Sequence, residues 1–134
     1  MKMHKRSIYD TRFFIEYFYS TDQTLLKKLK EDLKATKERL VSAVTIHEIH
    51  RINLEREGKE AATLRSEIIH RDFKIINVDY ETAVESAELR SKHKIPMADS
   101  IIAATAQIHN SPVVSDDPHF KEIKNLKIRW YTTP

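Results

Sequence analysis

The chain contains no cysteine and a single glycine, Gly58, among its 134 residues. Without cysteine there are no disulfides and no thiolate metal sites, as we expect of a cytoplasmic protein. One glycine excludes the glycine-rich loops with which P-loop and dinucleotide-binding proteins surround phosphate groups. No apolar run approaches the roughly 20 residues that a membrane-spanning helix requires. The basic start, Met1–Arg6, is followed by Asp10, Arg12 and Glu16, so no secretion signal is expected either.

What the chain does contain is typical of a folded domain. Hydrophobic residues make up 40% of the sequence and charged residues 32%, which is a globular rather than a disordered composition. A chain of 134 residues can enclose one hydrophobic core but not two, so we expect a single domain over residues 1–134. The net charge of +3 is compatible with a polyanionic partner such as RNA but does not identify one.

Short apolar runs alternate with longer segments of helical periodicity. The runs expected to form strands are Ser7–Tyr9, Leu40–Ala43, Phe73–Ile76, Pro112–Ser115 and Leu126–Trp130. Helical patterns lie between them, including Ala98–Ile108, and Gly58 is expected to separate two helices after the second strand. Strands separated by helices predict an α/β fold, a three-layer α/β/α sandwich around a five-stranded parallel sheet.

Four acidic residues occupy comparable places in this layout. Asp10 ends the first strand and Asp117 follows the fourth. Glu48 is expected in the first turn of a helix that Thr45 caps, and Asp99 in the first turns of a later helix. Ligand sites in such folds form at the carboxyl ends of the strands, so we expect all four acids at one rim of the sheet.

A group of carboxylates at one rim points to a bound cation, because they cannot all stay ionised without one. Oxygen ligands favour Mg²⁺ or Mn²⁺, and such ions hold a phosphodiester, lower the pKa of a bound water and stabilise the leaving oxygen. Each acid alone also has a structural explanation. Glu48 and Asp99 place favourable charge at helix N-termini, while Asp10 and Asp117 suit turns. The joint placement of the four favours the metal site.

Four segments resemble the motifs of one protein family. Ile8–Thr11 is similar to its first-strand signature, an apolar pair before Asp-Thr, and Ser42–Ile49 resembles its segment with a helix-borne Glu. Ile95–Ala106 resembles its Pro-x-Ala-Asp helix, and Val113–Phe120 its last motif, Thr-x-Asp-x-x-Phe. In order and spacing, the chain resembles the PIN-domain family, and most closely the VapC-type toxins of toxin–antitoxin pairs and their archaeal relatives.

The resemblance implies a metal-dependent endoribonuclease that hydrolyses RNA phosphodiester bonds. It implies catalytic and metal-binding roles for Asp10, Glu48, Asp99 and Asp117, with Mg²⁺ or Mn²⁺ as cofactor. It further implies a homodimeric toxin and a small VapB-type antitoxin that neutralises it. The alternatives are an RNA-processing nuclease without an antitoxin, and a non-catalytic PIN-fold module that binds RNA or protein. The complete set of acids argues against the last of these.

Several residues near the acids are candidates for substrate binding or depart from the family pattern. Thr11, Arg12 and Ser115 are expected to contact substrate. Arg12 stands where many relatives carry Ser or Asn. Its guanidinium could contact a substrate phosphate or supply part of the positive charge that a metal ion would otherwise provide. His119 stands where many relatives carry a further acid, which leaves the number of bound metals open.

Two other patterns have simpler explanations. The aromatic residues from Phe13 to Tyr19 recur at helical spacing, which predicts that they pack in the core. They are more numerous than one buried helix face requires, and the remaining ones could form a groove that binds a second subunit or an antitoxin. His47 and His50 invite a zinc interpretation, but their spacing differs from that of the zinc metalloproteases, so no zinc site is expected.

Overall fold

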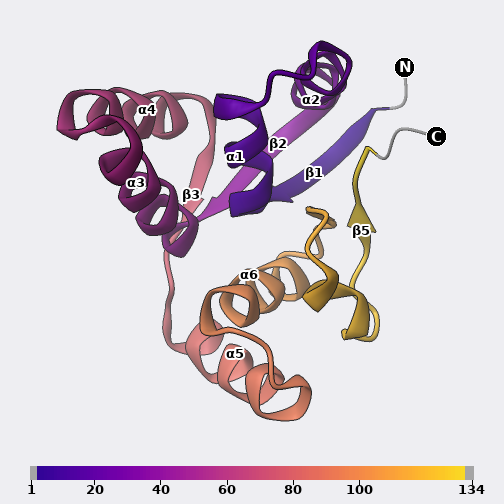
Figure 1. The fold of residues 1–134 in the computed structure, drawn as a ribbon. Coiled ribbons are helices and arrows are strands. Elements are labelled where there is room, and N and C mark those ends of the chain that lie inside the picture. Colours follow the sequence, from indigo (N-terminus) through magenta and orange to yellow (C-terminus); the bar gives the residue numbers. More distant parts are fainter. Residues whose placement is uncertain (1–2, 132–134) are drawn as a thin grey trace.

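The computed structural model describes residues 3–131 and contains one central sheet with helices on both of its faces (Figure 1). The strands are β1 His4–Tyr9, β2 Thr36–Ser42, β3 Lys74–Ile76, β4 Val113–Val114 and β5 Ile128–Arg129. They pair in parallel in the order β3-β2-β1-β4-β5. The predicted three-layer α/β/α sandwich with a five-stranded parallel sheet is confirmed.

Two helices connect each strand to the next from β1 to β4, and a short 3₁₀ helix lies between β4 and β5. The helices are α1 Thr11–Tyr19, α2 Gln23–Ala35, α3 Ala43–Glu57, α4 Lys59–Asp72, α5 Tyr80–His93 and α6 Met97–Ile108, and the 3₁₀ helix is η1 Pro118–Glu122. Gly58 separates α3 from α4 as predicted, with a φ of 90° that favours glycine. Among residues 3–131, none of these helices is long and apolar enough to cross a membrane.

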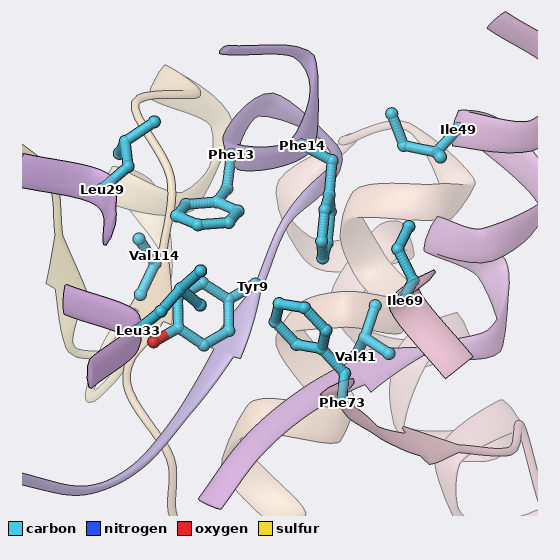
Figure 2. Close-up of a cluster of buried hydrophobic side chains, with 10 residues drawn as sticks. All are labelled: Tyr9, Phe13, Phe14, Leu29, Leu33, Val41, Ile49, Ile69, Phe73 and Val114. Carbon is cyan, nitrogen blue, oxygen red and sulfur yellow. The ribbon is translucent and has the colours of Figure 1, made fainter. Parts of the chain in front are cut away.

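Neighbouring residues of the central strands point to opposite faces of the sheet and build two hydrophobic cores. Ile8 of β1 packs in one core with Ile102 of α6 and with Phe120. The next residue, Tyr9, packs in the other core with Phe13 (Figure 2). Because both faces are buried, the strands appear in the sequence as continuous apolar runs rather than alternating ones.

Strand β2 begins at Thr36, well before the apolar run that predicted it. Arg6 of β1 lies opposite Glu38 of β2, and its Nε donates to Glu38 Oε2 at 3.2 Å. Oppositely charged side chains across two strands stabilise the start of the sheet where apolar packing is absent. The hydrophobic pattern alone therefore underestimates the length of this strand.

Helix α3 begins at Ala43, so the prediction that Thr45 caps it is wrong. Ser42, the last residue of β2, is the N-cap, and its Oγ accepts the Val44 N–H at 3.2 Å. The strand passes into the helix without a connecting loop, which moves the start of the helix towards the N-terminus. Glu48 consequently lies in the second turn of α3 and not in the first.

The strand order reverses at β1, and this reversal positions the site. The chain adds β2 and β3 on one side of β1, then passes through α5 and α6 to the other face and adds β4 on the opposite side (Figure 1). Strands β1 and β4 are therefore neighbours, with Tyr9 paired to Val114. The carboxyl ends of two strands at such a reversal are where ligand sites form in α/β folds.

Candidate metal centre

Asp10 and Asp117 come close together because they follow the two neighbouring strands at the reversal. Asp10 directly follows β1, is the N-cap of α1 and is 2% exposed. Ser115, which follows β4, donates from Oγ to Asp10 Oδ2 at 2.6 Å and accepts the Asp117 backbone N–H at 3.0 Å. The Ser115 hydroxyl is thus engaged with both acids, which favours a positioning role over substrate binding.

Asp99 reaches the same place from the first turn of α6, with its side chain 12% exposed. Its Oδ2 lies 2.8 Å from Nδ1 of His119, and the same Nδ1 lies 2.8 Å from Asp117 Oδ1. Each of these three residues offers one possible metal-ligand atom, and the three atoms all lie within 4.8 Å of one another. Within the described part of the chain, no other group of three or more His, Cys, Asp or Glu residues meets this criterion. From the sequence, His119 was noted only as a departure from the family pattern. Its position two residues after Asp117 was the signal that could have placed it in the site.

Glu48 lies outside this group of three. It is partly buried on α3, and its Oε1 accepts a hydrogen bond from Thr11 Oγ1 at 2.5 Å. Because Thr11 directly follows Asp10, Glu48 is held beside the acids rather than among them. The structure therefore brings Asp10, Asp99 and Asp117 into electrostatic contact and leaves Glu48 at the edge.

Arg12 forms an ion pair with Asp116 next to the acids. Its Nε donates to Asp116 Oδ1 at 3.0 Å, and its Nη2 lies 3.8 Å from Glu16 Oε1. Asp116 thus faces Arg12, whereas Asp117 faces His119. The ion pair connects α1 to the segment that carries Asp117 and His119.

Burial and mutual repulsion make Asp10 and Asp99 hard to ionise. Burial raises the pKa of Asp10 to about 6, although the hydrogen bond from Ser115 lowers it. The pKa of Asp99 is raised to about 7, first by burial and then by the charges of Asp117 and Asp10, while His119 opposes the shift. Without a cation, these two carboxyls therefore keep protons up to near-neutral pH.

The donor set fits a divalent cation. Carboxylates from different elements converge together with an imidazole nitrogen. Positive charge between them would relieve the repulsion that adds to the effect of burial on the pKa of Asp99. Asp10, Asp99 and Asp117 are the residues that would hold the ion, with His119 beside them and Glu48 at the edge. A divalent ion there supplies a Lewis acid that offsets the negative charge of a phosphodiester.

We expect the metal-free protein to lose stability as the pH rises towards neutrality. Asp10 and Asp99 bind protons more tightly when folded, so their contribution is present below the ordinary pKa of 3.8 and is lost as the pH passes about 6 and 7. Thermal melts in EDTA at about pH 5 and about pH 8 measure this loss.

The variant Asp99→Asn provides the comparison for these melts, since it removes one of the two raised pKa values. The loss of stability between the two pH values should be smaller in Asp99→Asn than in the wild type. Mn²⁺ added at the higher pH should raise the wild-type melting temperature. If the melting temperatures of the wild type and of Asp99→Asn changed equally with pH, the raised pKa of Asp99 would not be the cause of the loss of stability.

The chain matches the model of the PIN domain over residues 8–126. Solved structures with the same fold include VapBC2 from Rickettsia felis bound to a DNA fragment from its promoter, with 19% identity, a TM-score of 0.79 and coverage of 95% of this chain and 99% of that one. Another is VapC20 from Mycobacterium tuberculosis, described as a sarcin–ricin loop cleaving toxin, with 16% identity, a TM-score of 0.76 and coverage of 91% and 98%. A toxin–antitoxin complex from Klebsiella pneumoniae shows 24% identity, a TM-score of 0.71 and coverage of 90% and 94%. No curated protein matches the chain in sequence.

The structural likenesses at this level of identity show a shared fold, and the family match adds the sequence evidence. The matched range includes every residue of the candidate site, from Asp10 after β1 to His119 in η1. The chain belongs to the PIN domain family, and its fold is that of the solved VapC toxins.

Proposed function

We propose that this protein is a metal-dependent endoribonuclease that hydrolyses RNA phosphodiester bonds and acts as the toxin of a toxin–antitoxin pair. The observation that carries the proposal is the convergence of Asp10, Asp99 and Asp117 where the strand order of a PIN domain reverses. Membership of the family and the toxins among the structural relatives support the assignment.

The contacts of each residue suggest its part in the reaction. Asp10, Asp99 and Asp117 hold Mg²⁺ or Mn²⁺, and Ser115 positions the first of them through its 2.6 Å hydrogen bond. Glu48 is the outer carboxylate of the set, oriented by the hydroxyl of Thr11. Arg12 lies at the rim with its side chain 43% exposed, where its guanidinium can leave Asp116 for a substrate phosphate.

We expect the purified protein to cleave single-stranded or loop RNA in the presence of Mg²⁺ or Mn²⁺, and to stop completely in EDTA. Without the cation, a cluster of carboxylates repels the phosphodiester that it must bind. An end-labelled hairpin RNA resolved on a gel reports both the rate and the position of cleavage. Excess metal added after EDTA should restore cleavage, which separates chelation from loss of the fold. Full cleavage activity in metal-free buffer would contradict the proposal.

A groove of about 280 Å³ between α1, α2 and α4 is the surface that we propose for the antitoxin. Its lining is mostly apolar, with Phe14, Tyr17, Phe18, Leu33, Ile68, Ile69 and Phe73, and its charged side chains are three basic ones, Lys30, Lys34 and Arg39, and one acidic one, Asp72. This chemistry fits a peptide segment that carries apolar and acidic residues. The VapBC2 structure among the structural relatives supports a VapB-type partner. A homodimer remains part of the proposal, on the family resemblance.

A further inference from the structure

We infer that His119 is a ligand of the bound cation and that its imidazole gives the site a preference for Mn²⁺ over Mg²⁺. This inference rests on the proposed function, because it concerns the ion that the nuclease would use. A single ring nitrogen of His119 lies between two carboxylates that come from different parts of the chain.

The Nδ1 atom of His119 has the spacing of a ligand next to two others. It lies 2.8 Å from Asp99 Oδ2 and 2.8 Å from Asp117 Oδ1. Adjacent ligands of an octahedral ion are about 3 Å apart when each lies about 2.1 Å from the metal. A ring nitrogen carries at most one proton, which cannot serve both carboxylates as well as a cation placed between all three atoms.

The local structure of the chain holds the imidazole in this place. Pro118 begins η1, and Asp117 Oδ1 accepts the backbone N–H of His119 at 2.9 Å, so the ring is held over the acid two residues earlier. The His119 side chain is 47% exposed, whereas that of Asp99 is 12% exposed. A half-exposed ring can make the small adjustment that a bound ion requires while the buried acid stays in place.

A nitrogen ligand changes which divalent ion the site prefers. Mg²⁺ binds oxygen ligands and gains little from imidazole, whereas first-row transition-metal ions such as Mn²⁺ accept both nitrogen and oxygen. The substitution His119→Asp converts the donors to oxygen alone and so removes this advantage. We expect it to lower the ratio of Mn²⁺ to Mg²⁺ affinity by about tenfold or more.

The experiment uses Mn²⁺ as the probe on the full metal-free chain. Electron spin-echo envelope modulation detects nitrogen bound directly to Mn²⁺, and we expect this signal in the wild type. It should disappear in His119→Gln and His119→Asp, and persist in His70→Gln, which changes an exposed histidine in the last turn of α4. Displacement of bound Mn²⁺ by Mg²⁺ measures the affinity ratio in the same samples.

Bound Mn²⁺ without a coupled nitrogen in the wild type would overturn the inference, and an unchanged affinity ratio in His119→Asp would do the same. Neither result would contradict the proposed function. That function is tested separately, by measuring RNA cleavage with the same samples. Nitrogen coupling in a protein that cleaves no RNA would support the ligand role and overturn the nuclease. A chain that binds no Mn²⁺ would overturn both. The wild-type spectrum decides ligation even if a variant fails to fold.

Discussion

Asp99→Asn and Asp10→Asn are each expected to lower the rate of RNA cleavage by about a hundredfold or more. Asparagine keeps the shape of the side chain and removes the charge that holds the cation. The same change relieves repulsion, so the metal-free variants should melt at the wild-type temperature or above it. Cleavage assays and thermal melts with and without Mn²⁺ measure both effects on the same samples, and Mn²⁺ should no longer raise the melting temperature.

Asp116→Asn is the matched control, because Asp116 lies on the same segment as Asp117 but faces Arg12. It should cost much less activity than Asp117→Asn. If it proves the more damaging change, the motif register in this segment is wrong by one residue. A plain helix-terminus role for Asp99 predicts a different thermal result, in which Asp99→Asn loses about 0.3–1 kcal/mol and metal has no effect on either protein.

Arg129→Met is expected to lower the free energy of unfolding by about 3–5 kcal/mol, and the melting temperature by about 10–20 °C. Arg129 donates to Asp32 Oδ2 at 2.9 Å and to Oδ1 at 3.1 Å, and the Asp32 side chain is 0% exposed. Tyr9 donates to Asp32 Oδ1 at 2.5 Å. Without the guanidinium, a buried carboxylate loses its counter-charge and β5 loses its connection to α2.

Urea unfolding of a matched pair tests this expectation. The control is Arg51→Met, because the Arg51–Glu55 ion pair at 3.0 Å joins two exposed side chains of α3 and should contribute about 0.5 kcal/mol or less. Arg129→Met combined with Asp32→Leu should recover part of the lost stability, since no charge is then left unpaired. Equal unfolding curves for Arg129→Met and Arg51→Met would show that the buried ion pair contributes little.

The secondary structure and the fold class could be predicted because their signals are local. Apolar pairs such as Ile8–Tyr9 mark strands that are buried on both faces, and strands are found there in the structure. Asp22 and Asp79 are the N-caps of α2 and α5, and each accepts a backbone N–H of the first helical turn from two or three residues away, which is also a local signal. The prediction was wrong at the start of α3, where Ser42 ends the strand and caps the helix itself. Ser42 and Thr45 are both residue types that cap helices, and the hydroxyl of Ser42 is the one that accepts a backbone N–H, from Val44.

The sequence by itself determined the alternation of strands and helices and the placement of acids where strands end, because both follow from residues that are neighbours in the chain. Only the tertiary structure decided which acids meet. Ser115 and Asp10 are 105 positions apart, yet they are hydrogen-bonded because the reversal of strand order makes β1 and β4 neighbours. The same packing brings His119 to Asp99 and leaves Glu48 at the edge of the site. No local pattern contains these contacts, since they depend on how the layers pack together.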